Sequence, residues 1–190
     1  MFRMKKNVQY LWALILLVFY ACNDTPVPKP DGYFRIELPQ QKYQRFNHTD
    51  CNFSFDYAQS AVIEKQKNCF LNISYPSLKA KFHISYLEIN NNFNELIDQE
   101  YEMREKHNAF ASSVKELVFQ NPNKKVNALV FDISGKKAAT PLQFFISDST
   151  NHFFRGSLYF YNSPNNDSLA PVIEFLKEDL NRLIESFEWK

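Results

Sequence analysis

Three stretches in the first half of the chain alternate apolar and polar side chains with a period of two. They span residues 52–57, 70–75 and 81–89. Successive side chains of a strand point to opposite faces, so this alternation predicts antiparallel strands with one buried face. Residues 33–38 also alternate before Pro39, which indicates either a short edge strand or a segment laid on the domain.

A helical spacing replaces the alternation after the Asn90-Asn91-Asn92 run. Side chains that can pack on one face recur three and four residues apart: Phe93, Leu96, Ile97, Tyr101 and Arg104. The asparagines mark a break and supply a cap. We therefore expect an amphipathic helix through about His107, with a charged outer face.

A second group of strands is predicted after Asn121-Pro122-Asn123, in residues 125–133, 141–147 and 152–160. Turn residues at 134–136 and 148–151 separate them, so they form a three-stranded meander.

The last helix has the clearest pattern. Asp167-Ser168 is expected to cap it, with Pro171 in the first turn. A buried stripe is predicted from eight apolar residues: Leu169, Val172, Ile173, Leu176, Leu180, Leu183, Ile184 and Phe187.

Strands, helix, strands and helix follow one another without strict strand–helix alternation. This order predicts an α+β domain, with an antiparallel sheet and two packed amphipathic helices. The arrangement is similar to the Mog1/PsbP-type fold, an analogy that says little about activity.

Aromatic residues occupy adjacent positions at Phe144-Phe145, Phe153-Phe154 and Tyr159-Phe160-Tyr161. Adjacent strand residues point to opposite faces, so some of these rings must leave the main core. Either a helix covers the second face or a partner does.

The first 21 residues have the order of a secretion signal. Three positive charges precede an apolar run at residues 10–21 that is too short to remain as a membrane span. Phe19-Tyr20-Ala21-Cys22 looks like a lipobox, although Phe19 and Tyr20 are bulkier than the usual residues. We therefore expect cleavage before Cys22 and lipidation of its thiol. An uncleaved inner-membrane anchor and an ordinary signal with a stray thiol are the alternatives.

The predicted domain organisation follows from this signal. Residues 1–21 are the signal peptide, residues 22–32 are the lipidated end and a proline-rich tether, and residues 33–190 are a single α+β domain. Three prolines favour an extended, semi-rigid tether.

Composition and charge narrow the class of protein. From Cys22 on, 169 residues carry 19 Lys and Arg against 21 Asp and Glu, a formal charge of −2, so we expect no nucleic-acid partner. A hydrophobic content of 45% with 19 Phe and 10 Tyr excludes disorder and predicts an aromatic core.

Cys51 and Cys69 each begin a predicted strand, and export would place them where disulfides persist. A disulfide between them is plausible, and two separate buried thiols are the alternative. Neither belongs to a CxxC motif, which argues against redox catalysis and zinc binding.

Catalytic motifs are missing from the sequence. His48, His83, His107 and His152 lack the spacing of a zinc helix, and no nucleophile elbow or phosphate-binding loop occurs. The adjacent Glu178 and Asp179 are expected on a solvated helix face rather than in a glycosidase site. We expect no catalytic residues, no metal and no cofactor, hence no enzyme.

Two Asp-Ser pairs have alternative interpretations. Asp148-Ser149-Thr150 and Asp167-Ser168-Leu169 are similar to glycosylation sites of exported Bacteroidetes proteins. A turn and a helix cap are the plainer interpretation.

Several long segments resemble the GldD family of gliding-motility lipoproteins of Bacteroidetes. They are PKPDGYFRI at 28–36, HISY at 83–86, QFFISDSTNHFFRGSLYF at 143–160, DSLAP at 167–171 and IESFEWK at 184–190. The likeness covers essentially the whole chain after the signal. The resemblance supplies no catalytic residues.

The resemblance implies an accessory envelope lipoprotein, required for gliding motility and for assembly or stability of the type IX secretion and gliding machinery. Other envelope lipoproteins of that machinery would be its partners. No Lys followed by two acids stands just after Cys22, so we expect the outer membrane, facing the periplasm, while Asp24 leaves inner-membrane retention open.

The second hypothesis is a lipid-anchored periplasmic carrier or enzyme acting on an envelope component. It requires a cavity lined by Tyr and Phe with converging polar groups such as His83 or Arg155.

Overall fold

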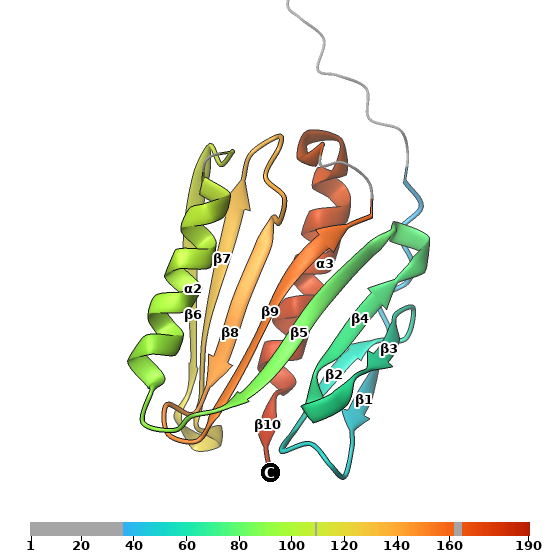
Figure 1. The fold of residues 1–190 in the computed structure, drawn as a ribbon. Helices are drawn as coiled ribbons and strands as arrows, with labels where there is room; N and C mark the ends of the chain where they lie inside the picture. The colour runs from blue at the N-terminus through green and yellow to red at the C-terminus, as the bar shows by residue number, and fades with distance from the viewer. Residues whose placement is uncertain (1–35, 109, 162–164) are drawn as a thin grey trace, which may run out of the picture. The chain divides into compact units, whose positions relative to one another are not determined.

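A computed structural model describes residues 36–190 except 109 and 162–164. Its main sheet is antiparallel and seven-stranded (Figure 1). In spatial order the strands are β3 (Val62–Lys65), β4 (Leu71–Tyr75), β5 (Ala80–Glu88), β9 (His152–Phe160), β8 (Leu142–Ser147), β7 (Val126–Ser134) and β6 (Ser113–Asn121).

A second sheet and two helices complete the described part. The small antiparallel sheet consists of β1 (Tyr43–Asn47), β2 (Phe53–Ala58) and β10 (Glu188–Trp189), with β2 in the middle. The helices are α2 (Phe93–Asn108) and α3 (Asn166–Ser186). Short 3-10 turns precede β4, β5 and β7, namely η1 (Lys67–Cys69), η2 (Pro76–Leu78) and η3 (Pro122–Lys124). The predicted α+β class, with antiparallel sheets and two helices, is confirmed.

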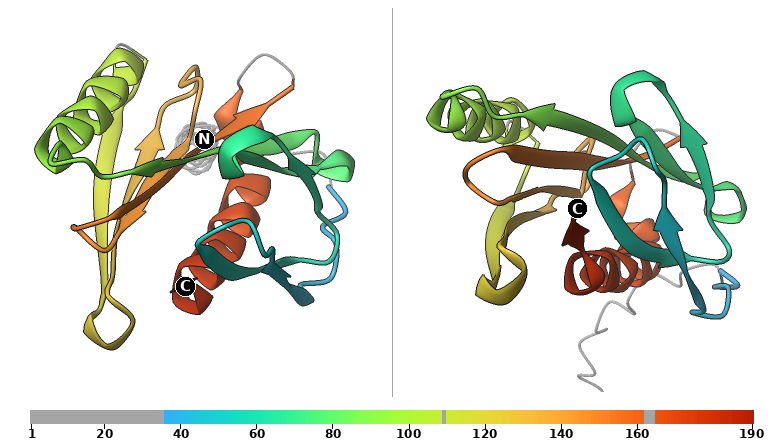
Figure 2. Two further views of the ribbon diagram at one scale, coloured as in Figure 1. Left: turned by 60° about the horizontal axis from the view of Figure 1, so that its bottom comes forward. Right: turned by 90° about the horizontal axis from the view of Figure 1, so that it is seen from below.

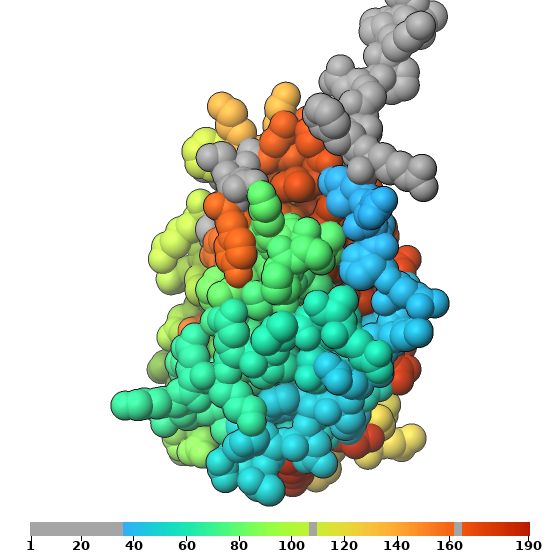
Figure 3. Space-filling model, turned by 90° about the vertical axis from the view of Figure 1, so that its right-hand side faces the viewer, coloured from blue at the N-terminus to red at the C-terminus, as the bar shows by residue number. Residues whose placement is uncertain are grey.

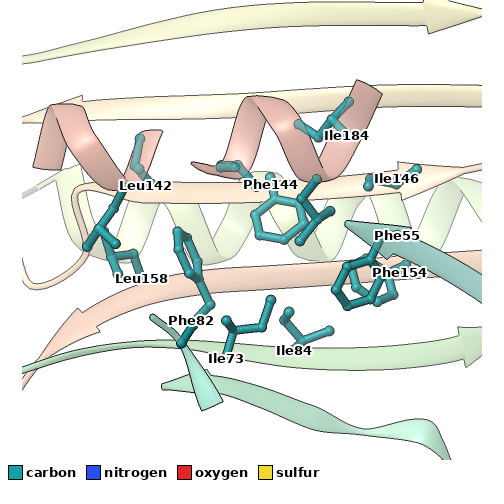
Figure 4. Close-up of a cluster of buried hydrophobic side chains, with 14 of the residues drawn as sticks. Phe55, Ile73, Phe82, Ile84, Leu142, Phe144, Ile146, Phe154, Leu158 and Ile184 are labelled. Carbon is teal, nitrogen blue, oxygen red and sulfur yellow. The ribbon is translucent and has the colours of Figure 1, made fainter. Parts of the chain in front are cut away.

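The main core lies between one face of the large sheet, α3 and the small sheet (Figures 2 and 4). Five of the largest fully buried side chains of the described residues are phenylalanines of this core: Phe53, Phe55, Phe144, Phe154 and Phe187. Phe55 and Phe187 stack with ring centroids 6.2 Å apart, and Phe154 meets Phe187 edge-on at 5.1 Å. Aromatic pairs in this geometry add to the stabilisation from area burial alone.

Helix α2 covers the opposite face of the sheet over β6, β7 and β8 (Figure 1). Phe145 and Phe153 point into this second core, while their neighbours Phe144 and Phe154 point into the main core. The helix therefore covers Phe145 and Phe153, whereas Tyr159 is only half-buried and Tyr161 is exposed.

Four strands are not predicted by the sequence patterns: β1, β3, β6 and β10. The predicted strand at residues 33–38 lies partly outside the described residues. Its described part, residues 36–38, is not in a strand, and Ile36 packs against the main core. That contact matches the alternative of a segment laid on the domain.

The start of α3 also differs from the prediction. The helix is capped at Asn165 rather than at Asp167-Ser168, so Pro171 lies in the second turn. The buried Asn166 amide donates to the backbone oxygens of Gly135 (2.8 Å) and Ala138 (3.0 Å). These hydrogen bonds fix the first residue of the helix against the β7–β8 connection.

Candidate interaction surface

Helix α2 covers one end of its face of the large sheet, and no other helix or sheet of the described residues covers the remaining end. Along β5 the side chains of Phe82 and Ile84 enter the main core, and those of Lys81 and His83 point the opposite way. We call this uncovered surface the open face. Its members on β3, β4, β5 and β9 and directly after β9 are Glu64, Asn72, Ser74, Lys81, His83, Arg155, Ser157, Tyr159 and Tyr161. Figure 3 views the molecule from the side, where the segment from β1 to β5 forms most of the surface.

One row of polar side chains crosses the open face in register. Glu64 is paired with Asn72, Asn72 with His83, and His83 with Ser157. The Asn72 amide nitrogen donates to Glu64 (3.2 Å), so its oxygen accepts a hydrogen bond from His83 Nδ1 (3.0 Å). Burial, followed by the nearby Lys81 charge, lowers the pKa of His83. His83 is therefore neutral at pH 7, with Nε2 left as an acceptor.

Two tyrosines flank this row. The Tyr159 ring meets the His83 ring edge-on at 5.6 Å. Tyr161 is 56% exposed, its hydroxyl lies 3.2 Å from Ser74 Oγ, and the Lys81 ammonium lies 5.6 Å from its ring centre. Both rings are thus held in place while part of their surface faces solvent.

The charges of the open face are paired internally. Lys81 donates to Glu64 at 2.8 Å, and Arg155 donates to Glu100 of α2 at 2.9 Å. Glu100 is only 2% exposed, and burial raises its pKa although Arg155 acts in the opposite direction. The surface therefore offers Tyr, His and Arg side chains with little net charge, a composition typical of protein interfaces.

The sequence singled out His83 and Arg155 as cavity-lining groups. The structure places them on one face of the neighbouring strands β5 and β9. Neither lines the hollow that is presented below for the described parts of residues 36–190. In the same residues, no three His, Cys, Asp or Glu side chains gather in a way that could hold a metal ion.

The cysteines divide between described and undescribed residues. Cys22, the predicted lipidation site, lies outside the described residues, as do the signal peptide and tether. Cys51 and Cys69 form a disulfide with their Cα atoms 5.6 Å apart, which joins the β1–β2 connection to η1. Among the described residues, no helix has the length and apolar character needed to cross a bilayer.

Asp148-Ser149-Thr150 forms a turn. The Asp148 carboxylate accepts hydrogen bonds from the backbone N–H groups of Thr150 (3.0 Å), Asn151 (2.8 Å) and His152 (2.9 Å). Partial burial would raise the pKa of Asp148, but these N–H groups lower it below its usual value. The carboxylate thus has a structural role in the β8–β9 hairpin.

The expectation of a solvated face for Glu178 and Asp179 is wrong for Asp179. Asp179 is 3% exposed, and its carboxylate accepts a hydrogen bond from the Tyr43 hydroxyl at 3.0 Å. Burial, followed by the charge of Asp179, raises the pKa of Tyr43 to about 12. The hydrogen bond between Tyr43 and Asp179 therefore links β1 to α3.

Sequence reasoning missed Asn72 and Glu100. Asn72 lies within the alternating run at 70–75 and Glu100 within the predicted first helix, but neither pattern marks a functional residue. Their partners, His83 and Arg155, are 11 and 55 residues away, so the pairing required the sheet register. For Glu100 the available signal was an acidic residue four positions after Leu96, on the face that the helical spacing predicts to be buried.

Comparisons with known proteins add the family. A family model described as "Gliding motility lipoprotein GldD" matches residues 23–189. No curated protein sequence matches the chain. Three solved chains match, among them the solution structure of cyanobacterial PsbP from Synechocystis sp.. That structure is 10% identical, has a TM-score of 0.48, and is aligned over 80% of this chain and 95% of its own. Because the family model extends over nearly the whole chain, the chain belongs to the gliding motility lipoprotein GldD family.

Proposed function

We propose that this lipoprotein is a non-enzymatic, partner-binding component of the gliding and type IX secretion machinery. Family membership associates the chain with gliding motility and with a lipid anchor. The outer membrane, facing the periplasm, is the proposed location, and another envelope lipoprotein of the machinery is the proposed partner.

The open face is the observation that carries the proposal. Tyr161 and His83 are exposed there, and hydrogen bonds to Ser74 and Asn72 restrain their side chains. Because these two side chains are already restrained, they lose little further conformational entropy when a partner binds. This favours them as anchors of an interface. Because Lys81 and Arg155 already have carboxylate partners, the proposed surface of the partner is polar or aromatic rather than strongly charged.

Deletion tests the role in the machinery. We expect a deletion strain to stop spreading and to secrete less of the proteins that carry the type IX signal. Normal spreading, with loss of the protein verified by immunoblot, would contradict the proposal.

Site-specific crosslinking tests the surface. A photo-reactive side chain at position 161 should give an adduct with an envelope protein in living cells. The matched control is position 118, because Val118 is 68% exposed but lies on β6 at the far edge of the sheet. Equal adducts from both positions would count against the open face.

A further inference from the structure

The folded domain has a hollow of about 540 Å³ beside the Cys51–Cys69 disulfide. Its walls come from the β1–β2 connection, from η1, from the end of β5 and from the first turn of α2. The lining residues fall in three stretches, 50–52, 68–70 and 86–96, so the hollow exists only in the folded chain. None of its lining residues belongs to the open face.

The lining combines amide groups with an apolar floor. Four asparagines line it, namely Asn52, Asn68, Asn90 and Asn92. Phe70, Tyr86, Leu87 and Leu96 supply apolar surface. The Asn52 nitrogen donates to Tyr86 and the Asn92 oxygen accepts from the Asn90 N–H, and the remaining donors and acceptors of the four amides suit hydroxyl groups, which can both donate and accept. Small-molecule sites in proteins have this combination of concave apolar surface and fixed polar groups.

The charges at the hollow select against anions. Asp50 and Glu88 line it, and no Lys, Arg or His occurs among its described lining residues. An anionic ligand would therefore meet two like charges. The carboxylates can instead accept hydrogen bonds from hydroxyl groups.

Contacts with His152 and Asn52 hold the Tyr86 side chain in place. It is 8% exposed, and its hydroxyl lies 2.7 Å from His152 Nδ1 and 3.4 Å from the Asn52 amide nitrogen. The His152 ring in turn stacks on Trp189 with centroids 5.1 Å apart. This chain of contacts fixes the hydroxyl at the hollow, so little ordering is required when a ligand binds.

The disulfide fixes the wall that η1 and the β1–β2 connection form. Cys69 lines the hollow, and its bond to Cys51 connects η1 to the β1–β2 connection. The neighbouring Asn68 has a left-handed backbone (φ 58°) that places it at this wall.

We propose that this hollow binds a neutral oligosaccharide. Sugar hydroxyls would bind the asparagine amides, the two carboxylates and the Tyr86 hydroxyl, and the sugar's apolar ring face would pack on Phe70. The inference does not depend on the proposed role in the gliding machinery, because it rests on the lining of the hollow alone.

Isothermal titration calorimetry tests the proposal on the full chain, in a detergent without a sugar headgroup. The probes are trimers to hexamers of N-acetylglucosamine, the same lengths of glucose oligomer, and an oligogalacturonate as the anionic control. At least one neutral series should bind about tenfold or more tightly than the oligogalacturonate. Tighter binding of the N-acetylglucosamine oligomers would indicate that the ligand is a cell-wall-type glycan. Tighter binding of the glucose oligomers would indicate that the ligand is an unsubstituted polysaccharide.

Two variants locate the binding. Tyr86→Phe keeps the ring but removes the hydroxyl, so neutral-sugar binding should weaken about tenfold. Asn90 is exposed, and Asn90→Ala should also weaken neutral-sugar binding. This variant replaces Tyr86→Phe as the test if Tyr86→Phe lowers the melting temperature. Tyr159→Phe, the same change on the open face, should leave neutral-sugar binding unaltered.

Absence of binding by both neutral series would overturn the proposal. So would binding that stays at the wild-type level in Tyr86→Phe and Asn90→Ala. A loss of binding only in Tyr159→Phe would assign the sugar to the open face and overturn the assignment to the hollow.

Discussion

At the scale of single residues, Gly156 shows how tightly the main core is packed. A Cβ atom at this position would lie 2.7 Å from Phe144 Cε1 and 3.1 Å from Ile84 Cγ1. Phe144 is fully buried and cannot turn aside. Glycine is therefore needed here because of the close approach of a ring, not because of its backbone angles.

We predict that Gly156→Ala destabilises the domain by about 2 kcal/mol through overpacking. The free energy of unfolding in urea measures the effect. Ser157→Ala, one residue further and on the open face, is the control and should change stability by less than about 0.5 kcal/mol. Equal stability of Gly156→Ala and wild type would show that the core yields more easily than its packing suggests.

The Arg155–Glu100 pair predicts a pH-dependent effect. In Arg155→Ala the buried Glu100 carboxylate loses its partner, which should cost about 3 kcal/mol at pH 8. Burial already raises the pKa of Glu100, and removing Arg155 removes the cause that lowers it. Protonation of Glu100 then favours the folded state, so the destabilisation should shrink as the pH falls through this raised pKa.

Thermal unfolding of wild type and variant between pH 8 and pH 5 measures this dependence. The double variant Glu100→Gln/Arg155→Ala should lose most of this pH dependence, because no carboxylate remains at position 100 to titrate. A stability difference between Arg155→Ala and wild type that stays constant over this pH range would contradict the account of Glu100.

At the scale of elements, the predicted strands are those with one fully buried face. The alternating runs at 52–57, 70–75 and 81–89 correspond to β2, β4 and β5, which supply much of the main core. Strand β6 was not predicted because, as an edge strand, it has no fully buried residue, and Val118 near its centre is 68% exposed. Strand β10 has two residues and exists only through its pairing with β2, far away in sequence.

The open face was predictable only in part. Adjacent aromatic residues at 144–145, 153–154 and 159–161 correctly indicated that both faces of the sheet carry rings. Which of them a helix covers depends on the path of α2, which the sequence pattern does not contain. The row from Glu64 to Ser157 depends on the register of three strand pairs, and a shift of one residue would turn these side chains to the other face.

The disulfide should stabilise the small sheet and the edge formed by β3 and β4. Its cysteines are 18 residues apart, so Cys51→Ser/Cys69→Ser should lose about 3 kcal/mol of stability by the chain-entropy estimate. Unfolding in urea measures the loss, and wild type with excess reductant should behave like the double variant. If reductant leaves the stability of wild type unchanged, the bridge does not contribute to it.

At the scale of the whole molecule, the family match indicates a lipid-anchored protein. The predicted anchor, Cys22, lies outside the described residues, and the domain after it presents both the open face and the hollow. A Cys22→Ser variant should remain unprocessed by signal peptidase II and lack the lipid, which metabolic labelling with a fatty acid can show. Undiminished labelling of the variant would place the lipid elsewhere.

The most direct test of the account is gliding by cells whose only copy carries His83→Ala and Tyr161→Ala. Both side chains are exposed, so the domain should fold and accumulate normally, which immunoblotting of membranes verifies. Val118→Ala is the matched control on the far edge strand. We predict that the control glides like wild type and that the double variant spreads no better than the deletion strain. Normal gliding of the double variant would contradict the claim that the protein works through its open face.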